Sequence, residues 1–272
     1  MKTVIGTLLV FLIGLTTYKG FIDRQYFERY VFNVDEILIG RQWSRLISSG
    51  FLHVSWLHYG FNMVALLAFS WSLEVVLGVP KYLLIYMGSL IGGNLLALYI
   101  HRFHGDYRAV GASGAISGII FSAIILFPDI KISLILLPLE MPTWLFGALF
   151  VLVSILGIKS QSDNIGHDAH LGGAIVGILL TCLLEPSVLR NSWWLVLLVL
   201  LPTTAFLLLI VRNPAVLMVD NYWGESVKNI GRRPTRRRKK RLNLDDILDK
   251  VKRKGVDALT PEEKAFLDRF SE

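Results

Sequence analysis

Seven stretches of the chain are almost wholly apolar, and polar connections separate them. They are Val4–Tyr18, Trp56–Leu77, Tyr82–Ile100, Val110–Phe127, Trp144–Ile158, Ala169–Leu184 and Trp193–Val211. A helix of about 20 apolar residues crosses a bilayer. In lipid, only α-helices and closed β-barrels satisfy all of their backbone hydrogen bonds internally. None of the stretches shows the apolar–polar alternation of barrel strands, which leaves helices. The pattern predicts an all-α polytopic membrane protein.

The pattern divides the chain into four parts. Residues 1–54 contain the first transmembrane helix and a long polar loop, and residues 55–190 form the membrane core together with that helix. Residues 191–212 form a seventh transmembrane helix, and residues 213–272 form a basic polar tail. Within the tail, helical spacing over 244–251 and a capping box at 260–263 predict two short helices.

Composition adds one feature to this picture. The chain is 53% hydrophobic and 18% charged, whereas soluble domains are about a quarter charged. Its net charge of +7 comes from residues 232–241, RRPTRRRKKR, which contain eight basic residues. Such a block next to a membrane is attracted to anionic lipid headgroups, and we expect no nucleic-acid partner. The single cysteine, Cys182, lies in an apolar stretch, where we expect it to pack.

Polar residues gather near the starts of the second, fourth and sixth apolar stretches. His58 and Asn62 are four residues apart and share one helix face, while Ser113 and His170 lie near the starts of the other two. If successive helices alternate in direction, these three starts meet at one face of the membrane. Ionisable groups at membrane depth are costly and usually functional. The pattern therefore predicts a polar site near one face of the bilayer.

These residue types suit acyl transfer. A serine hydroxyl is a weak nucleophile until a base takes its proton, and a neutral histidine is the usual base. Acyl transfer also needs donors directed at the developing oxyanion, a role that His58 and Asn62 suit. Ser113 and His170 are thus a candidate dyad.

The small residues around this serine fit the same interpretation. Gly111 and Gly114 allow backbone and substrate to approach Ser113 closely. Gly173 and Gly177 form a small-xxx-small face after His170, on which the helix of Ser113 could pack. We expect this packing to bring the two helices together.

Other interpretations of these residues are weaker. Ser113 alone would be read as a helix-packing serine. Asp168 lies two residues from His170 on a helix, so the two side chains face nearly opposite sides, and we do not expect a triad. Ser117 lacks the preceding glycine that the nucleophile position needs. His101, His104 and Asp106 lie in one loop, which we interpret as solvated, so we expect neither a metal nor a cofactor.

Three segments together resemble the rhomboid intramembrane serine proteases. They are GASG at 111–114, AHLGGAIVG at 169–177 and HVSWLHYGFN at 53–62. The resemblance extends to Trp43-Ser44-Arg45 and to Glu74 with Gly78, and it covers roughly residues 41–177. It implies a six-helix rhomboid-like bundle, to which this chain adds the seventh helix and the small C-terminal tail.

The resemblance also implies roles for single residues. Ser113 is the expected nucleophile and His170 the expected base, with no acidic third member. His58, Asn62 and the Ser113 amide are the expected oxyanion donors, and His53, Arg45 and Glu74 the expected structural residues. One departure is Ser117, where the family commonly has an aromatic ring stacked on the histidine. Without that ring, His170 loses a stacking contact worth ~0.5–1.5 kcal/mol.

The implied function is hydrolysis of peptide bonds in or near transmembrane segments of other membrane proteins. The partners are then transmembrane substrates and the bilayer. An inactive rhomboid-like protein that binds transmembrane clients is the alternative. A transporter is a weaker alternative, because the chain shows neither repeated halves nor paired broken helices.

Membrane orientation rests on two opposing arguments. The resemblance implies a multi-pass protein of a bacterial-type plasma (inner) membrane with an extracytoplasmic active site. The positive-inside rule opposes this, because the first loop alone contains Lys19, Arg24, Arg29, Arg41 and Arg45. We follow the resemblance for the core and leave the side of the tail open.

Overall fold

A computed structural model describes residues 4–133, 140–160, 165–213, 250–252, 259, 260 and 264. The chain divides into two compact units, Met1–Leu217 and Met218–Glu272. The basic block at 232–241 and most of the two expected tail helices lie outside the described residues.

Within the described residues, seven membrane helices occur where the hydropathy pattern predicts them. Helices α1 (Ile5–Ile22), α5 (Trp56–His101), α8 (His167–Leu184) and α10 (Trp193–Arg212) are long and apolar enough to cross a membrane. Helices α6 (Ser113–Leu126) and α7 (Thr143–Ser160) are apolar but shorter. The 46 residues of α5 are two helices joined at Gly78, whose φ of 72° suits glycine, and Pro80 follows in the next turn. The chain is a helical polytopic membrane protein.

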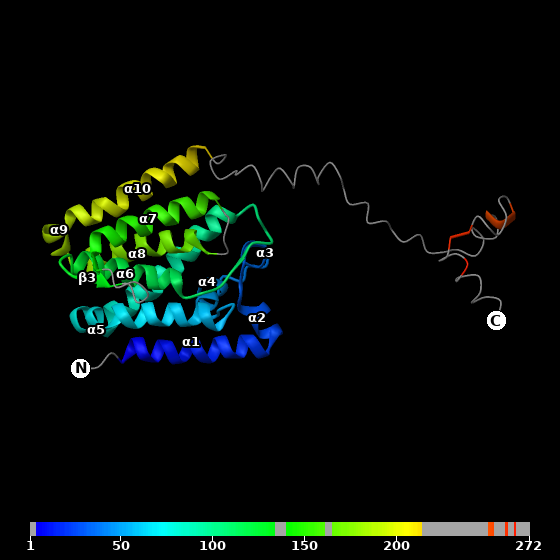
Figure 1. The fold of residues 1–272 in the computed structure, drawn as a ribbon, viewed down its shortest axis with the longest axis horizontal. Helices are drawn as coiled ribbons and strands as arrows, with labels where there is room; N and C mark the ends of the chain where they lie inside the picture. The colour runs from blue at the N-terminus through cyan, green and yellow to red at the C-terminus, as the bar shows by residue number, and fades with distance from the viewer. Residues whose placement is uncertain are drawn as a thin grey trace. The chain divides into compact units, whose positions relative to one another are not determined.

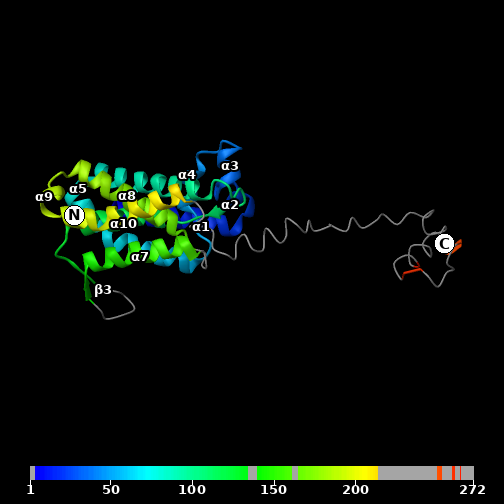
Figure 2. The same ribbon diagram turned by 90° about the horizontal axis from the view of Figure 1, so that it is seen from above.

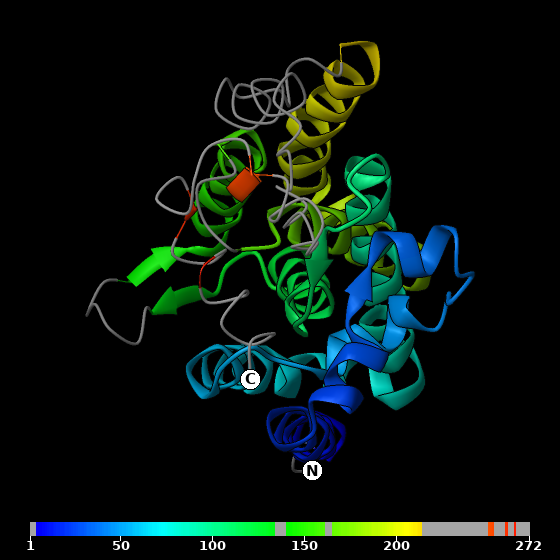
Figure 3. The same cartoon turned by 90° about the vertical axis from the view of Figure 1, so that its right-hand side faces the viewer.

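Helix α6 lies inside the bundle. It packs against α5 and α8, while α1 and α10 lie at opposite edges (Figures 1 and 3). Twelve of its fourteen residues are buried. Fourteen helical residues extend for about 21 Å, less than the ~30 Å of the hydrocarbon core. At least one end of α6 therefore lies below the membrane surface, where other parts of the protein surround it.

The expected long polar loop after α1 is folded. It contains α2 (Arg24–Tyr30), β1 (Phe32–Asn33), α3 (Val34–Leu38), α4 (Arg45–Ser48) and the 3₁₀ turn η1 (Ser49–Phe51). Strand β1 pairs antiparallel with β2 (Arg108–Ala109), just before Ser113. The buried Arg45 guanidinium donates to the carbonyls of Glu28 and Val31 at 2.9 and 2.6 Å. The loop thus holds the segment that leads to Ser113.

Two smaller features lie at the other end of the helices. Strands β3 (Lys131–Ser133) and β4 (Glu140–Pro142) form an antiparallel ribbon that projects from the bundle (Figures 2 and 3). The short helix α9 (Val188–Asn191) connects α8 to α10. Lys81 and Glu185 form an ion pair at 2.5 Å that joins the third membrane helix to the end of α8.

Glu74 holds the start of α1. Its carboxylate accepts the backbone N–H groups of Val4, Ile5 and Gly6 at 3.2, 3.2 and 2.6 Å. The first N–H groups of a helix have no partner within the helix, and a negative charge there also suits the helix dipole. The residue before α1, Val4, has no capping side chain. Glu74 therefore replaces the missing cap from the second membrane helix.

Glu74→Ala should lower the free energy of unfolding of the detergent-solubilised protein by about 1–3 kcal/mol, because three backbone donors lose their acceptor. The measurement is the melting temperature. Glu74→Gln should lose less, since one amide oxygen still accepts. The matched control is Glu140→Gln, which removes an exposed pair with Lys131 that is worth little. Equal melting temperatures for Glu74→Ala and the control would show that Glu74 does not hold α1.

Candidate active site

The backbones of α6 and α8 are in direct contact next to Ser113 and His170. A Cβ on Gly173 would overlap the carbonyl oxygen of Gly114, and a Cβ on Gly114 would lie 3.3 Å from the carbonyl oxygen of Ala169. One turn further, a Cβ on Gly177 would lie 2.5 Å from Cα of Gly118. Ser113 precedes Gly114, and His170 follows Ala169. The contact therefore places the first residue of α6 beside the first turn of α8.

Gly111 fits closely against His58. Its φ is 133°, a conformation that favours glycine, and a Cβ there would lie 3.0 Å from the imidazole of His58 and 3.8 Å from Oγ of Ser113. Its N–H donates to the carbonyl of Ser49 at 3.0 Å. The glycine thus lets His58 approach the serine while the loop stays attached to η1.

His53 and Asn62 support the same histidine. The ring of His53 is fully buried and lies edge to face with His58, with 4.8 Å between centroids. Its Nδ1 lies 3.0 Å from Oγ1 of Thr17. Burial, and to a smaller extent His58, lowers the pKa of His53 to about 3, so this ring stays neutral. Asn62 is buried and donates one amide hydrogen to the carbonyl of His58 at 3.0 Å, which leaves its second hydrogen for another acceptor.

Two aromatic rings flank His170, and sequence analysis identified neither. Phe150 of α7 and His167 of α8 have ring centroids 5.8 and 5.9 Å from it. Ser117, noted above as a departure from the rhomboid pattern, donates to the carbonyl of Ser113 at 2.8 Å. These two ring contacts to His170 come from α7 and from α8 itself. Phe150 gives no local sequence signal, because its closeness to His170 depends on how α7 packs.

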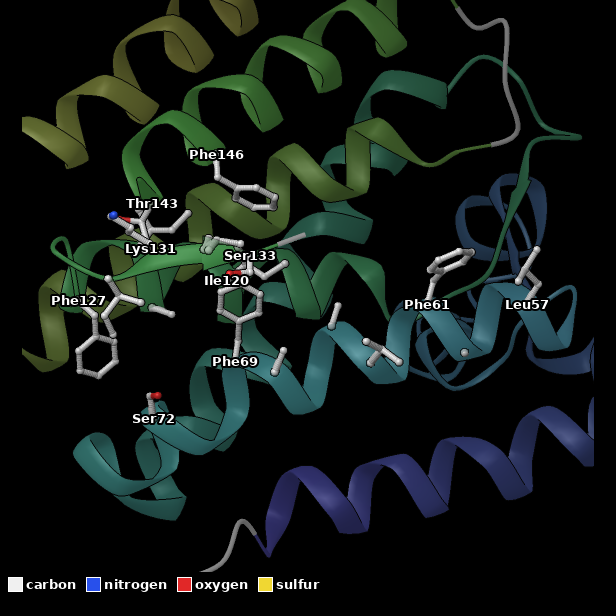
Figure 4. A pocket seen from close by; sticks show the side chains of 18 of the residues that line it. Leu57, Phe61, Phe69, Ser72, Ile120, Phe127, Lys131, Ser133, Thr143 and Phe146 are labelled. Carbon is white, nitrogen blue, oxygen red and sulfur yellow. The ribbon is translucent and has the colours of Figure 1, made fainter. Parts of the chain in front are cut away.

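An apolar groove lies beside this site. It has a volume of about 820 Å³, and the first half of α5, α6, the start of α7 and β3 line it (Figure 4). Leu57 and Phe61, which flank His58 along α5, lie at one end, and Ser72 and Lys131 lie near the other. From Leu57 to Ser72 a helix rises about 22 Å. The groove therefore follows most of the thickness of the apolar layer.

Comparison with known proteins identifies the class. The family model of the rhomboid domain matches residues 40–187, and a family of unknown function matches residues 234–272. Rhomboid protein 1 of Saccharomyces cerevisiae mitochondria is 34% identical over 137 residues, which are 49% of this chain and 40% of that protein. Rhomboid protease AarA of Providencia stuartii is 30% identical over 178 residues, 58% of this chain and 62% of that protein.

A third relative is the human presenilin-associated rhomboid-like mitochondrial protein, 30% identical over 141 residues. The match covers 50% of this chain and 36% of that protein. The chain thus spans well under half of the length of both mitochondrial relatives. Because the domain match includes more than half of the chain, the protein belongs to the rhomboid family.

Gly173→Ala should destabilise the protein by about 1–3 kcal/mol, the usual cost of overpacking, because its methyl group has to displace the backbone of α6. The measurement is the melting temperature in detergent. Gly166→Ala, at the start of the same helix, is the control, because its Cβ would meet neighbours only at 3.6 and 3.9 Å. A Gly173→Ala protein as stable as the control would contradict the backbone contact between α6 and α8.

Proposed function

We propose that this protein is an intramembrane serine protease that cleaves transmembrane segments of other proteins with a Ser113–His170 dyad. The observation that most supports the proposal is the glycine-mediated contact of α6 and α8, which brings the starts of the two helices together. Both dyad residues are only partly buried, as residues that meet a substrate must be. Membership of a family that includes Rhomboid protease AarA supports it further.

In this mechanism, His170 takes the proton from Ser113 as the Oγ atom attacks the scissile carbonyl carbon. The carbonyl oxygen becomes an oxyanion, which the side chains of His58 and Asn62 and the Ser113 N–H stabilise. As the first residue of α6, Ser113 has a backbone N–H without a partner in its helix. His170 then gives the proton to the leaving amine, and water, deprotonated by His170, hydrolyses the acyl-enzyme.

The apolar groove suits a transmembrane segment as substrate. Its walls are mainly aliphatic and aromatic, and it extends along α5 from the neighbours of His58. A helix protects its own peptide bonds by hydrogen bonding, so the segment has to unwind where it meets Ser113. The pairing of β1 with β2 holds the loop before Ser113 in place beside this unwound segment.

We further propose that the site faces the extracytoplasmic side of a bacterial-type plasma membrane. The relatives named above are one bacterial protease and two mitochondrial proteins, so the choice of membrane remains a prediction. The proposed headgroup contact of residues 232–241 and the division of the chain at 54, 190 and 212 are predictions of the same kind.

Ser113→Ala and His170→Ala should each abolish cleavage of a model transmembrane substrate in proteoliposomes, because without the base the hydroxyl stays protonated. Ser117→Ala is the matched control. It should retain activity, because its hydroxyl donates to the backbone carbonyl of Ser113 and has no part in the dyad. Gel filtration establishes that each variant is folded. Normal cleavage by folded Ser113→Ala would exclude the dyad. A wild-type protein that binds transmembrane substrates but does not cleave them would favour the inactive, client-binding alternative.

Asn62→Ala and His58→Ala should each reduce kcat by about 10²–10³ without abolishing cleavage, the usual effect of losing one oxyanion donor. KM should change far less, because the donors act on charge that develops in the transition state. Asn191→Ala, an exposed asparagine of α9, serves as the control. If both variants turned over at the wild-type rate, the oxyanion site would lie elsewhere.

A further inference from the structure

Asp168 makes a set of contacts that no role in the proposed dyad explains. It lies in the first turn of α8, is buried, and its Oδ1 accepts the N–H of Ala169 at 2.8 Å. Its Oδ2 lies 3.0 Å from Nε2 of His101 and 3.5 Å from the hydroxyl of Tyr107. The carboxylate thus faces the end of α5 and the following loop. The interpretation of His101 as part of a solvated loop was wrong, because His101 ends α5 and only 12% of its side chain is exposed.

The two partners of Asp168 are themselves held in place. The rings of His101 and Tyr107 are stacked, with 3.5 Å between centroids and an angle of 5°. Phe32 of β1 meets Tyr107 edge to face at 6.1 Å, and the Tyr107 carbonyl accepts the N–H of Val34 at 3.3 Å. Burial, and then Asp168, raises the pKa of the Tyr107 phenol, which stays protonated and donates. Asp168 is therefore bound to a rigid neighbourhood.

The contacts of Asp168 connect the two segments that carry the residues of the dyad. Asp168 is two residues before His170 on α8, and Tyr107 is six residues before Ser113, on the segment that passes through β2 and Gly111. A buried carboxylate is costly unless donors satisfy it, so separation of α8 from this loop is unfavourable. The contact therefore resists relative movement of the two segments.

We propose that Asp168, His101 and Tyr107 are positioning residues that hold the first turn of α8, and with it His170, in register with the loop that leads to Ser113. The expected effect on catalysis rests on the proposed protease function. The contact of Asp168 with His101 and Tyr107 is independent of that function. Asp168 acts through the backbone of α8 and touches neither the substrate nor the reacting atoms.

The first test measures hydrogen exchange in the full-length protein in detergent and needs no activity. Asp168→Asn and His101→Ala should speed exchange at least fivefold in the first turn of α8 and in residues 105–112, and leave α1 and α10 unchanged. Asp106→Asn, an exposed carboxylate of the same loop, is the matched control. Wild-type exchange in both regions for both variants would overturn the proposal.

The second test measures kcat and KM for a transmembrane substrate. Asp168→Asn and His101→Ala should lower kcat at least tenfold with KM within twofold. His101→Gln should restore part of kcat, because its amide can still donate to the carboxylate, and Tyr107→Phe should lose least, because the stack remains. The double variant Asp168→Asn/His101→Ala should be no slower than the slower single variant, since both changes remove one contact.

The outcomes separate this inference from the proposed function. A wild-type protein without proteolytic activity, whose exchange still responds to Asp168→Asn, would refute the protease and leave the anchoring contact in place. An active protein whose folded Asp168→Asn and His101→Ala variants keep kcat within twofold would refute the positioning role. The positioning role would also be refuted if a variant with a lowered melting temperature recovered its kcat when assayed below that temperature. Such a loss of kcat would reflect stability alone.

Discussion

The structure depends on the close approach of α6 and α8, which is possible only because both helices lack side chains at the contact. Helices in lipid gain little from hiding apolar surface from each other, so their association relies on close packing of small residues. Gly114 and Gly118 of α6 meet Gly173 and Gly177 of α8 at backbone distance. This contact determines how near the two proposed catalytic side chains come.

The polar groups of the core fall into two kinds. Structural ones are bonded to backbone groups of other segments: half-buried Glu74 to the start of α1, and buried Arg45 to the carbonyls before β1. Ser113, His58 and His170 are half-buried and belong to the site at the contact of α6 and α8 and the adjoining loop. These are the groups that the proposed substrate would meet.

Sequence was sufficient for the features that depend on local pattern. Apolar stretches located the seven membrane helices, and glycines four residues apart indicated the packing face of α8. It was insufficient where residues far apart meet. The polarity of the first loop gave no sign of its pairing with β2, and nothing near Phe150 or Tyr107 indicates their contacts with His170 and Asp168. Helical geometry argued against a triad role for Asp168 but could not supply its partners, because His101 at the end of α5 and Tyr107 in the following loop are more than 60 residues from Asp168 in the sequence.

The most direct test of the central claim, that α6 and α8 together activate one serine, is to map the adduct of a fluorophosphonate probe on the purified protein by peptide mass spectrometry. Such probes modify a serine whose hydroxyl is activated by a nearby base. The account predicts one modified residue, Ser113, and loss of the adduct in folded His170→Ala. An unmodified protein, or an adduct on Ser113 that forms as fast without His170, would contradict it.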